Sequence, residues 1–344
     1  MPGWLRQVLS GHYIERGWHA LALLLIVASV LELAACVGLA YVAGFTQVQA
    51  VVEDFSWRWL AVVPAAWAVS YIGYYFAYRG VFHVQAGREL PTPILAAVAL
   101  AGFGGFLAYS GGSLDAYALR TAGAEEREVR VRVAGLAALE QGALALLGCG
   151  VSIAVLLGGM RGVPAGASIP WAVAPVPGFL IAFWLADRYR NRFSSHTGWH
   201  GLAGTLLHSV QMIRQLFAHP VRWGWAIVGM AVFWAADAIA AWAGLASFGV
   251  RMNLAALFIG FASGMLFTRR TGPLAGAGIL ALLLPLTISY CGVPFAAAVA
   301  GVFAYRMLSL WLPTPAYLAV LPTLRKIGDR RHQLEDNRCS GPGW

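Results

Sequence analysis

Residues 19–45 read HALALLLIVASVLELAACVGLAYVAGF, an apolar run with one charged residue, Glu32, near its middle. A helix that crosses the hydrocarbon core of a bilayer needs about 20 predominantly apolar residues, so this run is long enough to span a membrane. Lipid offers no hydrogen-bond partner to backbone N–H and C=O groups, and a spanning segment of this kind is therefore helical. The run predicts a transmembrane helix.

Similar runs fill most of the chain. Its 344 residues are 59% hydrophobic and 11% charged, with a mean hydropathy of +0.67, which is the composition of a membrane protein and excludes a large water-soluble catalytic domain. We predict an all-α, polytopic membrane helix bundle over residues 19–323, preceded by a short segment, 1–18, and followed by a basic, disordered tail, 324–344. The apolar runs are residues 19–45, 59–78, 90–114, 133–160, 169–186, 223–250, 252–268, 271–293 and 294–322.

The positive charges indicate how the chain crosses the membrane. The net charge is +9, but Lys and Arg lie mainly in the loops between apolar runs, where they predict orientation and contact with anionic headgroups rather than nucleic acid. If residues 90–114 enter and leave on one face, only Arg58, Arg161 and Arg251 lie outside; if every run crosses, the bias is weaker. We therefore predict about eight spanning helices, one or two re-entrant elements, and both termini in the cytoplasm of a bacterial cell.

Two glycine-rich breaks occupy corresponding positions in the two halves of the chain, each preceded by a Gly-Phe pair. Paired breaks of this kind are typical of the inverted repeats of transporters. Small residues also let membrane helices pack closely, and the sequence alone does not choose between the two explanations. The predicted re-entrant turns are at Gly111 and Gly112 in the first half and at Gly272, Gly276 and Gly278 in the second.

Four ionisable residues fall at bilayer depth: Glu32, Glu140, Asp237 and Arg306. Such groups are costly in a membrane unless they are paired or hydrated, so each is a candidate site residue. One arginine cannot neutralise three acids as simple pairs, which predicts that at least one acid is protonated or hydrated. Arg306 either locks two helices through a carboxylate or binds a phosphate in a hydrated groove, because a guanidinium offers a planar fork of donors.

Other charged residues flank the glycine-rich breaks. Arg269 and Arg270 precede the second break, where they supply a second cationic position or simply flank a helix on the cytoplasmic side. Asp115 and Arg120 follow the first break and are further candidates. The charged cluster at 125–132 is typical of a solvated helix face with ion pairs four residues apart. The chain has no nucleotide-binding or zinc-hydrolase motif, so we predict no catalytic residue, cofactor or metal.

Three segments resemble the closing part of the flippase-like family, which is the transmembrane region of lysylphosphatidylglycerol synthases, or multiple peptide resistance factors. They are TGPLAGAGI at 271–279, CGVPFAAAVAGVFAYR at 291–306 and LWLP at 310–313. The resemblance adds Tyr305, beside Arg306, to the candidate residues. In the first half, GGSLDAYALR at 111–120 is similar to a second family segment, and Glu140 occupies the place of its Glu-Arg pair. The sequence departs from the family at Gln141, where arginine is expected, and in lacking a glutamate after the second break.

The resemblance implies a lipid flippase or lipid-handling transporter that moves a phospholipid or a polyprenyl-linked lipid between leaflets. Its expected partners are membrane lipids with anionic or zwitterionic headgroups, together with a separately encoded lipid synthase. An alternative is a membrane glycosyltransferase that uses a polyprenyl-phosphate donor, with Glu53 and Asp54 in the first outer loop. A second alternative is a non-transporting scaffold for the lipid synthase.

Overall fold

The computed structural model describes residues 18–84, 92–104, 115–116, 119–120, 124–159, 163–189, 192, 198–266, 280–316, 318–320 and 322–323. In this part of the chain the secondary structure is helical, without β-strands, which confirms the predicted all-α bundle. Of the segment predicted at 1–18 only Trp18 is described, as the first residue of α2, and the segment predicted at 324–344 lies outside the described residues. The helices are α2 (Trp18–Ala43), α3 (Phe45–Glu53), α4 (Trp57–Leu60), α5 (Val62–His83), α6 (Thr92–Gly104), α8 (Glu126–Leu157), α9 (Ala165–Val173), α10 (Pro175–Tyr189), α11 (Gly198–Ala218), α12 (Pro220–Ala246), α13 (Leu254–Gly264), α14 (Leu280–Tyr290) and α15 (Phe295–Trp311).

Several helices are long and apolar enough to cross a membrane. Among the described residues there are five, or six if the bent pair Ser29–Ala43 and Phe45–Glu53, at 106°, is one span. The five are Trp57–His83, Glu126–Leu157, Ala165–Tyr189, Pro220–Ala246 and Phe295–Val320. The protein is therefore an integral membrane helix bundle.

Helix α13 is shorter than the span predicted at 252–268, and helix α14 is described only from residue 280 of the run predicted at 271–293. Each has 11 described residues, about 16 Å at 1.5 Å per residue, against a hydrocarbon core of about 30 Å. They pack closely, since a Cβ on Gly264 would lie 2.9 Å from the Cα of Leu284. An apolar run in the sequence can continue past the end of the helix that it contains, and α13 ends at Gly264. The structure therefore shows α13 as a short helix packed against α14, and residues 267–279 between them lie outside the described part of the chain.

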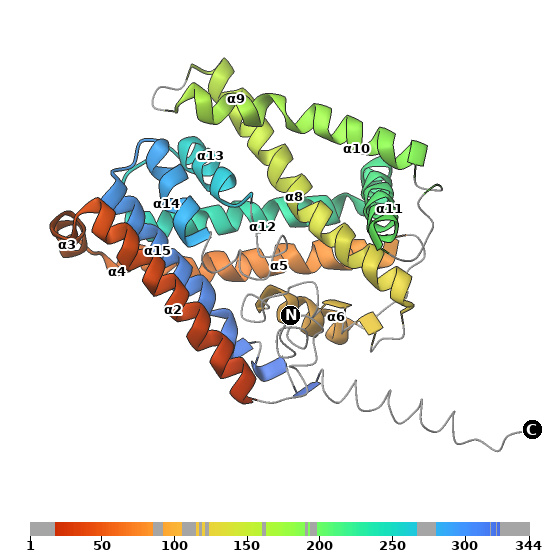
Figure 1. Ribbon diagram of the computed structural model, residues 1–344, viewed down its shortest axis with the longest axis horizontal. Helices are drawn as coiled ribbons and strands as arrows, with labels where there is room; N and C mark the ends of the chain where they lie inside the picture. Colours follow the sequence, from red (N-terminus) through yellow and green to blue (C-terminus); the bar gives the residue numbers. More distant parts are fainter. Residues whose placement is uncertain are drawn as a thin grey trace, which may run out of the picture.

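The centre of the bundle is the antiparallel pair α5 and α12, which lie side by side and are crossed by α8 (Figure 1). Gly73 and Gly229 meet where the two backbones approach most closely. A Cβ on Gly73 would lie 2.5 Å from the Gly229 carbonyl oxygen, and a Cβ on Gly229 would lie 2.6 Å from the Gly73 carbonyl oxygen. This contact is reciprocal, as in an interface between two equivalent elements.

Helix contacts in the two halves of the chain correspond. Helix α5 packs on α8 as α12 packs on α15, α3 packs on α15 as α11 packs on α8, and α2 packs on α15 as α9 packs on α8. Together with the antiparallel α5–α12 pair, this is the contact pattern that an inverted repeat produces. It supports the predicted internal repeat, although the glycines of the predicted re-entrant turns lie outside the described residues.

The helices differ in how much of their surface is covered by protein. The span that contains α12 has 56% of its apolar window buried, whereas the span formed by α9 and α10 has 11%. Helix α2 also exposes apolar side chains, among them Val30, Leu33 and Val37. Because exposed apolar side chains of a membrane bundle face lipid, α12 is central, and α2 and α10 form opposite lipid-facing flanks (Figure 1).

Candidate functional site

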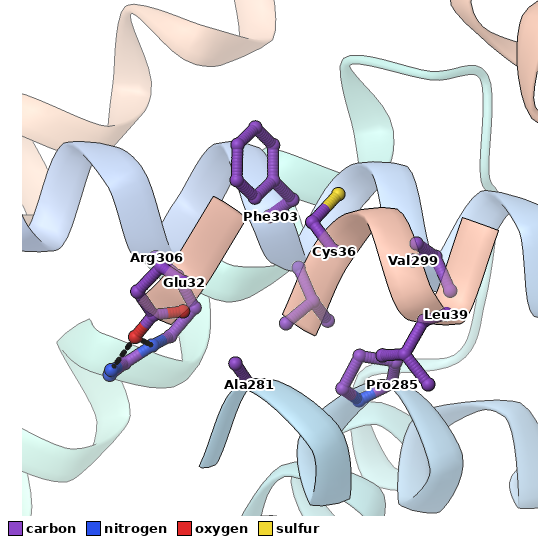
Figure 2. Close-up of a pocket in the computed structure, with 9 residues that line it drawn as sticks. Glu32, Cys36, Leu39, Ala281, Pro285, Val299, Phe303 and Arg306 are labelled. Carbon is purple, nitrogen blue, oxygen red and sulfur yellow. Dashed lines mark hydrogen bonds and ion pairs between the residues drawn. The ribbon is translucent and has the colours of Figure 1, made fainter. Parts of the chain in front are cut away.

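Arg306 forms an enclosed ion pair with Glu32. Helix α15 directs Arg306 toward α2, where its Nε donates a hydrogen bond to Glu32 Oε1 at 3.1 Å and its Nη2 donates to the same oxygen (Figure 2). Both side chains are only 2% exposed. The structure thus joins two of the four ionisable residues predicted at bilayer depth, as the helix-locking alternative expects.

A small cavity adjoins this ion pair between α2, α14 and α15. Its lining includes Glu32, Cys36, Ala281, Pro285 and Arg306, which Figure 2 shows around one space. The cavity volume is about 10 Å³, which is room for about one water molecule. The hydrated groove predicted around Arg306 is therefore not open in this conformation, because α2 packs directly on α15 and Glu32 supplies the partner that water would otherwise provide.

The neighbouring residue, Tyr305, connects α15 to α12. Successive residues point about 100° apart around a helix, so Tyr305 faces α12 while Arg306 faces α2. The Tyr305 hydroxyl donates a hydrogen bond to Asp237 Oδ1 at 2.8 Å. Tyr305 is buried and Asp237 half-buried. Helix α15 therefore holds two polar contacts on two of its faces, each to a different neighbouring helix.

Glu140 lies on α8 close to the same region of α12. It is 1% exposed, and its backbone carbonyl accepts a hydrogen bond from Trp234 Nε1 at 2.7 Å. Trp234 precedes Asp237 by one helical turn and contacts Phe261, which in turn contacts Tyr305. The structure thus brings Glu140 and Asp237 to one buried aromatic cluster, on a different face of α15 from the ion pair.

Asp115 and Arg120 are placed apart from Arg306. Asp115 is buried, and its Oδ1 accepts a hydrogen bond from the Tyr78 hydroxyl at 3.1 Å. Arg120 is exposed and donates through Nε and Nη2 to both carboxylate oxygens of Glu126, at 2.8 and 2.9 Å. These bonds raise the pKa of Arg120 above its ordinary value. Arg120 is engaged at the start of α8, and the structure does not bring it to Arg306.

The remaining predicted site residues fall outside the described part of the chain. They are Arg269, Arg270, Gly111, Gly112, Gly272, Gly276 and Gly278.

Arg132 belongs to the charged cluster at 125–132 that was predicted as a solvated helix face, and for Arg132 that prediction is wrong, because the structure buries it. Ion pairs four residues apart do form, from Arg130 and Arg132, but only Arg132 is enclosed, with its side chain 6% exposed. Its guanidinium donates to the carbonyls of Val81 and Phe82, both at 2.7 Å, and Val84, at 3.3 Å. The last carbonyls of a helix lack intrahelical partners, so a cation stabilises this end of α5. No local pattern predicts the contact, because it joins residues about 50 positions apart.

A larger cavity lies between α8, α9, α10, α13 and α14, and it too was not predicted. Its volume is about 570 Å³, and its lining includes Ala145, Ala174, Leu266, Leu286 and Tyr290. The cavity and the ion pair are both bordered by α14, since Ala281 and Pro285 line the small cavity beside Glu32.

Comparisons of the sequence with protein-family models and with curated proteins find no match. The fold and site define an integral membrane helix bundle that encloses an ion pair between two of its helices, and its function has to be argued from that arrangement.

Proposed function

We propose that this membrane protein is a lipid flippase or lipid-handling transporter that moves a phospholipid or a polyprenyl-linked lipid between leaflets. The observation that carries the proposal is the ion pair between Glu32 and Arg306. A buried ion pair often stabilises a protein no more than well-packed apolar side chains of similar volume would. Stability alone therefore does not explain why this pair is present. Charged groups kept at bilayer depth more often serve function, which favours a role in binding a charged substrate.

The proposed role of Arg306 is to bind the phosphate of the lipid headgroup. Helix α2 presents Val30, Leu33 and Val37 outward and Glu32 inward, so it forms a wall between Arg306 and the lipid on that flank. A tilt of α2 away from α15 exposes Arg306 sideways. A phosphate then replaces the Glu32 carboxylate, since both are anions that accept hydrogen bonds from a guanidinium. The hydrocarbon chains remain in the lipid.

The released carboxylate accounts for the expected lipid partners. Glu32, once separated from Arg306, is available to a cationic group on the same headgroup, which suits zwitterionic as well as anionic lipids. The charge bias of the loops supports the bacterial cytoplasmic membrane as the location, with both termini on its inner side. A separately encoded lipid synthase is the proposed protein partner. A lipid gradient or an ion gradient drives the movement.

The test is leaflet exchange of a fluorescent phospholipid in proteoliposomes, followed by quenching from outside. Arg306→Ala is expected to abolish exchange. Because that variant strands a buried carboxylate, the matched variant is the double substitution Glu32→Gln/Arg306→Gln, which removes both charges and keeps similar volumes. We expect the double variant to fold and to lose exchange as well. Exchange at the unaltered rate in the folded double variant would exclude Arg306 from the mechanism.

Arg120→Ala is the control for a change in surface charge. Arg120 is bound to Glu126 at the start of α8, so its loss is expected to leave exchange unchanged. The glycosyltransferase alternative gains no support from the described residues. Glu53 and Asp54 lie exposed at the end of α3, and both cavities described above are lined by other residues.

A further inference from the structure

The cavity between α8, α9, α10, α13 and α14, here called the α9–α14 cavity, has the size and the lining of a binding site. Its volume of about 570 Å³ falls within the range of about 300–1,000 Å³ that is usual for small-molecule sites. Small residues such as Ala145 and Ala167 leave the space, and Leu266 and Leu286 border it. Among the residues that the structure describes, the lining contains no Asp, Glu, Lys or Arg. The cavity is therefore suited to an uncharged, apolar group.

Three polar side chains of the cavity, those of Trp171, Ser263 and Thr287, are already hydrogen-bonded to protein. Trp171 Nε1 donates to Ser263 Oγ at 2.8 Å, and Ser263 Oγ donates to the Ile259 carbonyl at 2.8 Å. Thr287 Oγ1 donates to the Leu284 carbonyl at 3.1 Å. These donors are used within the walls, so they offer little to a peptide or to a charged headgroup. The occupant is recognised by its apolar surface.

The rim of the cavity reaches the lipid-facing surface. Leu266 and Leu286 are each 48% exposed and Tyr290 is 60% exposed, although all three line the cavity. The neighbouring helices α9 and α10 form the span with the least buried surface. An apolar cavity that opens on this flank of a membrane bundle is in contact with the hydrocarbon of the bilayer. Lipid is the component of its surroundings that can fill it.

Two prolines and a tyrosine hydroxyl shape the wall of the cavity on the α9 side. Pro170 lies inside α9, and Pro175 begins α10. Proline has no N–H, so these residues give no helical hydrogen bond to the carbonyls of Gly166 and Trp171 four positions earlier, and both of those residues line the cavity. The Tyr290 hydroxyl lies close to Gly166, 2.7 Å from the place a Cβ would take. The Tyr290 hydroxyl therefore places a polar group beside Gly166, at one edge of an otherwise apolar cavity.

We propose that the α9–α14 cavity binds one hydrocarbon chain of a membrane lipid, with the polar edge at Gly166 and Tyr290 next to the glycerol or phosphate end of that chain. The inference deepens the proposed function and rests on it, because it assigns the lipid's chain to a site separate from the headgroup site at Arg306. Helix α14 connects the two sites, with Pro285 beside the ion pair and Leu286 in the cavity. Acyl chains and polyprenyl chains are both apolar hydrocarbon, so both fit the lining of the cavity.

The experiment is photolabelling of the full chain in proteoliposomes. One probe is a phospholipid with a diazirine in its acyl chain, and the other is a polyprenyl phosphate with a diazirine in its chain. Mass spectrometry of the peptides is expected to place the label on α9 and α14. Competition with unlabelled phospholipid and with unlabelled polyprenyl phosphate identifies which chain the cavity accepts.

Matched tryptophan variants test whether the label depends on the cavity. Ala174→Trp fills the cavity, whereas Ala154→Trp adds the same side chain at an exposed position of α8. We expect the first variant to lose the α9 and α14 label and the second to keep it. If Ala174→Trp does not fold, Ala167→Phe replaces it.

Two results would overturn the chain site: label spread evenly over the lipid-facing helices, or label on α9 and α14 that survives filling of the cavity. Exchange measured on the same vesicles separates the two proposals. Cavity label without leaflet exchange supports the chain site and contradicts transport. Exchange without cavity label contradicts the chain site alone.

Discussion

Arg306 on α15 and Glu32 on α2 form an ion pair across 274 positions of the chain, and two nitrogens of the guanidinium donate to one carboxylate oxygen. The pair fastens the first described helix to the last long one at a depth where neither charge meets bulk water. It is thus a structural contact, and in the proposed mechanism it is the contact that a charged lipid headgroup opens.

Removal of one member of the ion pair is expected to destabilise the protein strongly. Arg306→Ala leaves the Glu32 carboxylate buried without its counter-charge, which typically costs about 3–5 kcal/mol. The double variant Glu32→Leu/Arg306→Leu replaces the pair by apolar side chains and is expected to match the original stability or exceed it. Thermal unfolding of the detergent-solubilised protein measures the stability of both variants. A double variant as unstable as Arg306→Ala would show that the charges themselves stabilise the bundle.

Arg132 is expected to matter far more for stability than its neighbour Arg130. Arg132→Ala removes the donor that three carbonyls at the end of α5 share, and unsatisfied buried acceptors cost about 1–3 kcal/mol each. Arg130 is exposed and lies 3.8 Å from Glu126, so Arg130→Ala should change the free energy of unfolding by less than about 1 kcal/mol. Equal effects of the two substitutions in urea or thermal unfolding would contradict the capping role.

Gly73 is expected to reject even one methyl group. Gly73→Ala places a Cβ about 2.5 Å from the Gly229 carbonyl oxygen, which forces α5 and α12 apart along the contact at the centre of the bundle. Gly150→Ala on α8 is the control, since its Cβ meets no atom within 4 Å and alanine favours the helix by about 1 kcal/mol. Thermal unfolding should show a lower melting temperature for Gly73→Ala and a higher one for Gly150→Ala. A neutral Gly73→Ala would mean that α5 and α12 can separate without cost.

Tyr305→Phe tests the contact between α15 and α12. The substitution keeps the ring and removes the hydrogen bond to Asp237, a loss of about 1.5–3 kcal/mol when the acceptor is charged. Tyr41→Phe, at a position that is 76% exposed, is the matched control and should be neutral. If Asp237→Asn restores the stability of Tyr305→Phe, the cost lies in the carboxylate left without its donor. A neutral Tyr305→Phe would exclude the hydrogen bond as a stabilising contact.

The sequence by itself determined that this chain is an all-α membrane bundle, because about 20 consecutive apolar residues leave the backbone no alternative to helix in lipid. It also predicted Glu32, Glu140, Asp237 and Arg306 as the ionisable residues at bilayer depth, because each lies within a long apolar run. The apolar run at 252–268 shows the limit of this reasoning, because hydropathy does not tell where a helix ends, and α13 ends at Gly264 after 11 residues.

Only the tertiary structure decided which acid Arg306 binds, that Arg132 closes the end of α5, and that an apolar cavity lies beside α14. Each of these depends on the direction in which two helices present their faces to one another. The direction in which a helix faces its neighbour is set by close packing, such as that of Gly73 on Gly229. Such packing joins residues that are far apart in the chain. A single sequence without relatives carries no signal of such contacts.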